Sequence, residues 1–108
     1  MDSLQTWTSL AKLGDIPDGV TAFKKKRKNV AVFKKNGEIK RIFEDNCPHN
    51  KRIKISDDYI VDGDTITCSF HGACWKLQDG EIVRGPGREG LLIYNFRIDP
   101  DGLVEILI

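Results

Sequence analysis

Short apolar segments alternate with turn signals along almost the whole chain. This spacing is typical of antiparallel strands joined by tight turns, because each apolar segment is too short for a stable helix. Asn36-Gly37 is the clearest turn, since both residues tolerate the positive φ of a two-residue hairpin. The pattern predicts strands at 20–23, 30–33, 39–43, 59–61, 65–68, 74–77, 81–83, 91–98 and 103–108.

These strands predict an all-β fold, an antiparallel β-sandwich or barrel. The only helix expected is a single turn at 10–13 or 13–16, before Pro17. Large aromatic side chains stand at strand positions, so we expect them in the core. They are Trp7, Phe23, Phe33, Phe43 and Phe96.

The composition is that of an ordinary globular protein, with 40% hydrophobic and 31% charged residues in 108 positions. This length predicts a single domain over 1–108. No apolar run approaches the roughly 18 residues that a membrane span needs, and the N-terminus has no secretory pattern. We therefore expect a cytoplasmic protein with no membrane association. Cysteines stay reduced in that compartment, so clusters of Cys and His indicate metal or catalytic sites before disulfides.

The charges are unevenly divided along the chain. Residues 1–54 contain 13 Lys and Arg and 6 Asp and Glu, whereas residues 55–108 contain 4 and 10. The division predicts either two charged faces or charges scattered by folding, and the sequence does not decide between them. The run Lys24–Lys28 is interpreted as a solvated hairpin turn, because no interleaved aromatics and no domain-wide basicity accompany it. Nucleic acid is not an expected partner.

The candidate chemistry is concentrated in two mixed pairs, Cys47-Pro48-His49 and Cys68-Ser69-Phe70-His71. They use both histidines of the chain, and each lies where a predicted strand meets a loop. Two thiolates and two imidazoles suit zinc, or a [2Fe–2S] cluster with cysteines on one iron and histidines on the other. Gly72 permits positive φ after the second pair.

Other interpretations explain the pattern less well. A nucleophilic Cys–His pair would leave the duplication unexplained, and zinc fingers usually group two Cys and two His separately. A redox-silent, mononuclear Cys2His2 zinc module stays open as an alternative. The third cysteine, Cys74, is interpreted as a small half-buried strand residue and not as a ligand.

The two pairs are followed by an aromatic residue, Trp75, and then by Leu77, Asp79-Gly80-Glu81 and Gly85-Pro86. This pattern resembles the Rieske [2Fe–2S] family. The greatest likeness is to the small Rieske ferredoxins of bacterial ring-hydroxylating dioxygenase systems. The resemblance implies that Cys47 and Cys68 bind the inner iron and that His49 and His71 bind the outer iron.

The resemblance also implies a β-sandwich base with a small cluster-binding subdomain at about 45–87. Two loops, 46–52 and 69–75, would hold the cluster, and Gly85-Pro86-Gly87 matches the family's covering proline loop. The residues expected to surround the ligands are Pro48, Gly72, Ala73, Trp75 and Pro86.

Four positions depart from the high-potential branch of the family. Arg52 and Phe70 stand where that branch has two bridged cysteines, and Ala73 and Trp75 stand where it has hydroxyl donors to sulfur. Donors to sulfur raise the potential, so their loss predicts a midpoint at the low end of the Rieske range, about −150 mV. The first loop also lacks the family's usual glycine after the histidine.

The function that the resemblance implies is one-electron transfer from a flavin reductase to a terminal oxygenase. The chain would be a monomeric carrier and not itself an enzyme. Lys51, Arg52 and Lys54 lie beside the expected cluster and are candidates for docking a redox partner. A Rieske-like small subunit of a larger oxidoreductase, such as nitrite reductase, is a second alternative besides the zinc module.

Overall fold

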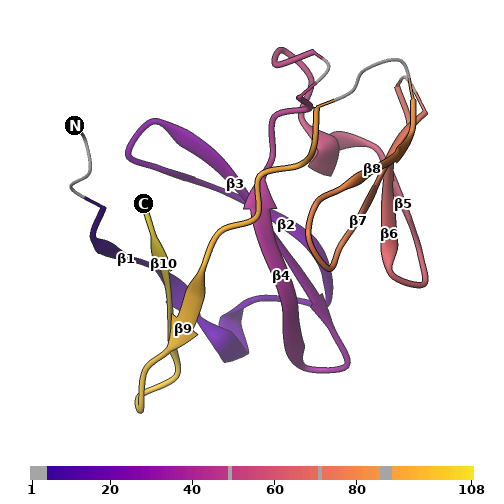
Figure 1. The fold of residues 1–108 in the computed structure, drawn as a ribbon. Helices are drawn as coiled ribbons and strands as arrows, with labels where there is room; N and C mark the ends of the chain where they lie inside the picture. The colour runs from indigo at the N-terminus through magenta and orange to yellow at the C-terminus, as the bar shows by residue number, and fades with distance from the viewer. Residues whose placement is uncertain (1–4, 49, 71, 86–88) are drawn as a thin grey trace.

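The computed structural model describes residues 5–48, 50–70, 72–85 and 89–108. Ten strands and two short 3-10 helices are found in these ranges (Figure 1). The strands are β1 (Trp7–Lys12), β2 (Gly19–Lys25), β3 (Lys28–Lys35), β4 (Glu38–Glu44), β5 (Tyr59–Asp62), β6 (Thr65–Cys68), β7 (Ala73–Lys76), β8 (Ile82–Arg84), β9 (Phe96–Ile98) and β10 (Leu103–Leu107). The helices are η1 (Leu13–Asp15) and η2 (Ile55–Asp57).

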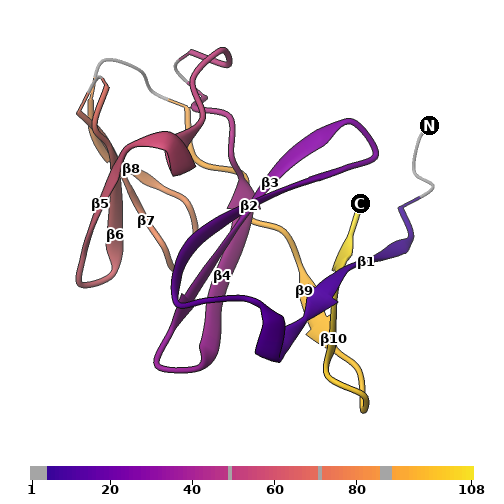
Figure 2. The same ribbon diagram turned by 180° about the vertical axis from the view of Figure 1, so that it is seen from behind.

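The strands of the described residues form three antiparallel sheets, which confirms the all-β prediction. Their strand orders are β1-β10-β9, β2-β3-β4 and β5-β6-β7-β8. The β2-β3-β4 sheet stands between the other two in both views (Figures 1 and 2). No helix of the described residues is long and apolar enough to cross a membrane.

Strand β3 separates two hydrophobic cores, because its side chains alternate between the two faces of the sheet. Val30 and Val32 belong to one core, and Ala31 and Phe33 to the other. All four are buried, which explains why residues 30–33 of this strand are all apolar. On β4, the neighbours Ile42 and Phe43 are divided between the cores in the same way.

We call these the base core and the loop-side core. The base core lies toward β1, β9 and β10. It contains Ile16, Val30, Val32, Ile42, Tyr94, Val104, Ile106 and Ile108. The loop-side core lies toward the β5–β8 sheet. It contains Ala31, Phe33, Phe43, Cys47, Ile55, Ile66, Cys68, Ala73, Trp75, Leu77 and Leu91.

Two hairpin predictions are confirmed by backbone geometry. Asn36 and Gly37 have φ of 55° and 79° between β3 and β4, as a two-residue turn of this type requires. The basic run also forms a hairpin turn, between β2 and β3. Lys26 and Arg27 occupy its tip with φ of 50° and 65°.

Two expectations about the ends of the chain were wrong or incomplete. No strand was predicted at 7–12, which forms β1. The helical turn lies at Leu13–Asp15, so the alternative at 13–16 is confirmed and the one at 10–13 is wrong. Of the strand predicted at 91–98, only Phe96–Ile98 is regular. The preceding part crosses between two sheets and touches β4 through the Phe43–Ile93 bridge, so it forms no continuous ladder.

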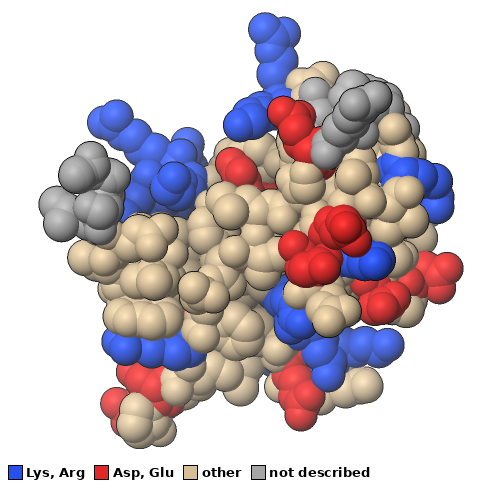
Figure 3. Space-filling view, viewed as in Figure 1, with Lys and Arg blue, Asp and Glu red and all other residues tan. Residues whose placement is uncertain are grey.

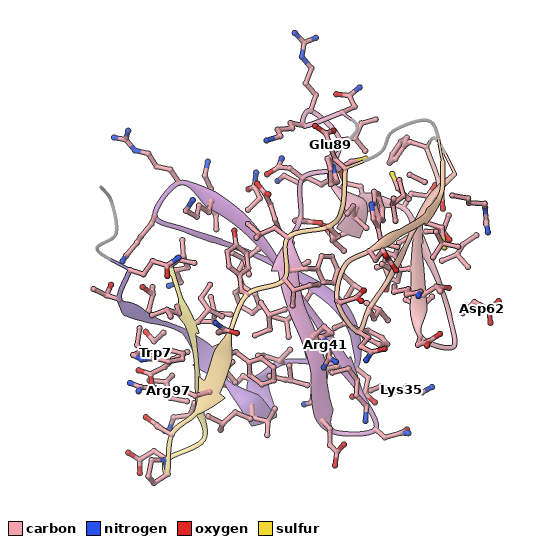
Figure 4. The ribbon with its side chains drawn as sticks, in the orientation of Figure 1. Trp7, Lys35, Arg41, Asp62, Glu89 and Arg97 are labelled. Atoms are coloured by element: carbon pink, nitrogen blue, oxygen red, sulfur yellow. The ribbon has the colours of Figure 1, made fainter. Side chains whose placement is uncertain are left out.

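The aromatic predictions divide into three groups. Phe33 and Phe43 are buried as expected, and Phe23 and Phe96 pack half-buried against the base core. Trp7 is 37% exposed and is not a core residue. The Arg97 guanidinium lies 4.2 Å from its ring centroid (Figure 4), so a cation, and not the core, covers this indole.

Candidate functional site

Cys47 and Cys68 both lie in the loop-side core, with no exposed surface. Cys47 follows β4 on the first loop, and Cys68 is the last residue of β6. The fold therefore brings together two cysteines that are far apart in sequence. The candidate ligands His49 and His71, and Pro86 of the proposed covering loop, fall outside the described residues.

The first loop is closed at its base by backbone pairing. Asn46 and Lys54 form an isolated antiparallel bridge, and the Cys47 amide donates to the Ile53 carbonyl at 2.9 Å. The backbone of Cys47 is thus fixed by the residues that leave the loop.

Asn50 organises the turn within this loop. Its side-chain oxygen accepts from the Arg52 amide at 3.1 Å, and its carbonyl accepts from the Ile53 amide at 3.0 Å. An Asn side chain that bonds the backbone two residues later makes an Asx-turn. The loop, which lacks the family's usual glycine, is therefore closed by an Asn-based turn.

A buried carboxylate that the sequence analysis missed lies two residues before Cys47. Asp45 has no exposed surface, and it accepts from the Ser56 amide at 2.8 Å and from the Ser56 hydroxyl. Its own amide donates to the Asn29 carbonyl, and its carbonyl accepts from the Ile55 amide. Asp45 thereby joins β3, the start of the first loop and η2. The only sequence signal was an acidic residue between an apolar strand and a candidate ligand.

The second loop is a short turn between β6 and β7. Cys68 pairs with Ala73 across the hairpin, and the Gly72 amide donates to the Cys68 carbonyl at 2.8 Å. Gly72 has φ of 72°, a conformation that glycine adopts without strain. Phe70, within the turn, is 52% exposed.

A third segment packs against the second loop. A Cβ on Gly85, whose φ is +136°, would lie 2.6 Å from the Cα of Ala73, so only glycine permits this approach. Beyond the covering loop, the Glu89 carbonyl accepts from the Trp75 indole N–H at 3.0 Å. Glu89 lies at the end of the molecule where the first two loops also lie (Figures 1 and 4).

Trp75 and Ala73 are buried beside the second loop. The single indole donor of Trp75 is already used by Glu89, and Ala73 has no side-chain donor. Neither side chain therefore replaces the hydroxyl donors that the high-potential branch of the family has at these positions.

Cys74 stands between these two residues on β7 and is buried, not half-buried as expected. Successive strand side chains point to opposite faces of a sheet. Cys74 therefore points away from the face that Ala73 and Trp75 share with the loop-side core. That it is not a ligand stays a prediction, which this orientation favours.

The donor set fits an iron–sulfur centre. Two buried cysteines sit at the bases of two loops and belong to one hydrophobic core, and each loop carries one histidine in sequence. Thiolate and imidazole are the ligands of a [2Fe–2S] centre with two cysteines and two histidines.

Comparison with known proteins decides the family. Residues 6–95 match the family profile of the Rieske [2Fe-2S] domain. The chain belongs to the Rieske [2Fe–2S] family. The cofactor of this family is a [2Fe–2S] cluster with Cys and His ligands, which replaces mononuclear zinc as the interpretation of the two pairs.

Three known proteins of different size resemble this chain. It is 27% identical to the biphenyl dioxygenase ferredoxin subunit of Pseudomonas sp. strain KKS102, over 87% of this chain and 85% of that protein. The structure of the Sphingomonas yanoikuyae B1 ferredoxin superposes with a TM-score of 0.79 at 26% identity, over 95% of this chain and 99% of that one. The terminal oxygenase of carbazole 1,9a-dioxygenase from Nocardioides aromaticivorans IC177 gives a TM-score of 0.79 at 22% identity, over 94% of this chain. The chain spans only 30% of that oxygenase.

Proposed function

We propose that this chain is a Rieske ferredoxin that carries single electrons from a flavin reductase to a terminal ring-hydroxylating oxygenase. It would act as a monomeric single domain in the cytoplasm and would perform no substrate chemistry itself. The cluster, when bound, supplies a one-electron redox couple.

The observation that carries this proposal is a match that extends over almost the whole of two ferredoxins. The chain covers 99% of the Sphingomonas ferredoxin and 85% of the biphenyl dioxygenase ferredoxin subunit. This coverage of two ferredoxins supports a ferredoxin-type carrier.

Four residues would hold the cluster. Cys47 and Cys68, both buried, would bind the inner iron, and His49 and His71 would bind the outer iron. Pro48, Gly72, Ala73, Trp75 and Pro86 would surround these ligands. Burial of the two cysteines excludes water from the inner side of the site, and the backbone bonds of both loops fix the positions of their sulfur atoms.

Anaerobic purification with iron and sulfide analysis tests the cofactor. We expect about two irons and two sulfides per chain and an EPR signal of low average g that appears only on reduction. A colourless protein that contains stoichiometric zinc would reject the proposal.

The carrier role is tested with the terminal oxygenase of a biphenyl dioxygenase system as electron acceptor. The reduced protein should be reoxidised by that oxygenase in a single-turnover experiment. Co-purification as a fixed stoichiometric subunit of a large oxidoreductase, without transfer to any separate acceptor, would instead support the small-subunit alternative.

Ala73 and Trp75 have no side-chain hydroxyl, and the indole N–H of Trp75 is engaged by the Glu89 carbonyl, which supports a low midpoint potential, about −150 mV. An EPR-monitored redox titration measures this value directly. A clearly positive midpoint would contradict the assignment to the low-potential group.

A further inference from the structure

Eight of the thirteen Lys and Arg residues of 1–54 lie at the turn of the β2–β3 hairpin or at the first loop, toward the end of the molecule that carries the ligand loops. The β2–β3 hairpin and the first loop both project toward this end in both ribbon views (Figures 1 and 2). The space-filling view shows one group of Lys and Arg atoms at the upper left and another at the top, with other residues between them (Figure 3). Folding therefore places part of the positive charge of the N-terminal half at this end, where Glu89 also lies.

The β2–β3 hairpin is held in place by one of its own lysines. The Lys26 ammonium donates to the Thr6 hydroxyl at 2.6 Å and to the Ile108 carbonyl at 3.2 Å. These bonds tie the hairpin tip to both ends of the chain, so its other basic side chains project from a fixed turn.

A relay of amide hydrogen bonds connects this hairpin to the first ligand loop. The Asn29 side chain, at the base of the hairpin, donates to the Asn46 side-chain oxygen at 3.2 Å. The same Asn46 amide donates to the Lys51 carbonyl at 2.8 Å. Asn46 thus fixes the hairpin and the loop relative to each other.

Six basic side chains on these two segments are exposed and form no ion pair with any described residue. We call them the basic rim: Lys24, Arg27, Lys28, Lys51, Arg52 and Lys54. The ion pairs found among the described residues lie elsewhere, on β4, between β7 and the turn before β8, and between β9 and β10. The charge of the rim is therefore available to a partner.

Several acidic residues of the C-terminal half lie away from the rim. Asp62 is labelled far from Glu89 and the loop end (Figure 4), and Asp99 and Asp101 flank the β9–β10 turn at the opposite end of the base. A positive edge and acidic turns elsewhere orient a molecule of small net charge as it approaches an oppositely charged surface.

We propose that the basic rim is one docking surface, which receives an acidic, carboxylate-bearing surface of the redox protein partner. This proposal extends the candidate docking site of Lys51, Arg52 and Lys54 to the hairpin. The identity of the partner as a redox protein rests on the proposed carrier function. A protein partner fits better than nucleic acid, because the net charge of the chain is only +1 and no row of aromatics accompanies the rim.

The test compares three triple variants of the holo-protein. The hairpin variant is Lys24→Glu/Arg27→Glu/Lys28→Glu, and the loop variant is Lys51→Glu/Arg52→Glu/Lys54→Glu. The control, Lys12→Glu/Lys35→Glu/Lys40→Glu, changes the net charge equally but away from the rim. Circular dichroism and the EPR signal establish that each variant is folded and loaded.

Binding of poly-L-glutamate, a carboxylate polypeptide, is measured by calorimetry at low and physiological salt. Hairpin and loop variants should each bind about tenfold more weakly than the control at low salt, and the wild-type affinity should fall as salt rises. A hairpin variant that binds like the control would overturn the joint surface. Duplex DNA that binds more tightly than poly-L-glutamate at physiological salt would overturn the assignment to a protein partner.

The outcome is separable from that of the proposed function. A wild-type protein without the cluster would reject the carrier proposal, whereas poly-L-glutamate binding reports on the rim alone. A loaded protein whose binding is insensitive to both rim variants would reject the rim and leave the carrier proposal standing.

Discussion

The base core and the loop-side core share β3 and β4 but differ in composition. The base core is aliphatic apart from Tyr94. The loop-side core contains two cysteines and two alanines, and it packs beside Gly80 and Gly85, whose backbones closely approach neighbouring backbone. The base core is a packing of side chains, whereas the loop-side core also brings three loops to one place.

This difference indicates that the two cores have different roles. In the base core, stability depends on buried aliphatic area. In the loop-side core, small residues and close backbone contacts place the two candidate cysteine ligands, so the packing there should depend partly on the cofactor. Three pairs of substitutions and one single substitution separate the two roles, and they are given below in order of decreasing effect.

The largest effect is expected for removal of a candidate ligand. Cys68→Ala should abolish cluster binding, because the remaining residues cannot complete the ligand set. Cys74→Ala, at a buried position on the same hairpin, is the matched control and should retain the cluster. Iron content and visible absorption measure both. Loss of iron in both variants, or in neither, would contradict the assignment of the ligands.

Adjacent residues on β4 test whether the cores are independent. Phe43→Ala and Ile42→Ala should each destabilise the fold, by about 3–5 and 2–5 kcal/mol. Only Phe43→Ala should speed iron release to a chelator, because Phe43 packs in the loop-side core. The milder Phe43→Leu and Ile42→Val serve if the alanine variants fail to fold. Equal rates of iron release would show that the cores are coupled.

A smaller effect is expected at the buried carboxylate. Ser56→Ala removes the hydroxyl donor to Asp45 and should cost about 1–3 kcal/mol, since it leaves a buried acceptor with one partner fewer. Hydrogen exchange should increase in the first loop and η2. The exposed Ser9→Ala is the control, and an unchanged exchange pattern in Ser56→Ala would reject a positioning role for Asp45.

The smallest effect is expected at Tyr94, in the base core. The Tyr94 hydroxyl is buried without a hydrogen-bond partner among the described residues. Burial, with a further contribution from Glu44, raises the pKa of Tyr94 from 10.0 to about 12.

The native state thus favours the neutral hydroxyl. Its contribution to stability is complete below pH 10 and is lost as the pH rises toward 12. Tyr94→Phe should therefore leave stability at pH 7 unchanged or slightly raised, by less than about 1 kcal/mol. The substitution should also make stability fall less steeply as the pH rises above 10. Denaturant unfolding at neutral and alkaline pH measures both, and an equally steep decline in the variant would assign the alkaline loss to other groups.

The sequence by itself determined the all-β class, most strands and the positions of the hairpins. These features depend on local rules: alternation of apolar residues, and dipeptides such as Asn36-Gly37 that tolerate positive φ. The two Cys–His pairs were equally visible, because metal-ligand spacing is a local pattern. The histidine ligands remain predictions from that spacing.

Only the tertiary structure decided which residues meet. β1 was missed and 91–98 was overextended, because the first pairs with the distant β10 and the second crosses between sheets. The burial of Asp45 depends on Ser56 and Asn29, and the basic rim depends on Asn46 joining segments far apart in sequence. Such contacts have no local signature, since each residue's partner is chosen by the packing of the whole chain.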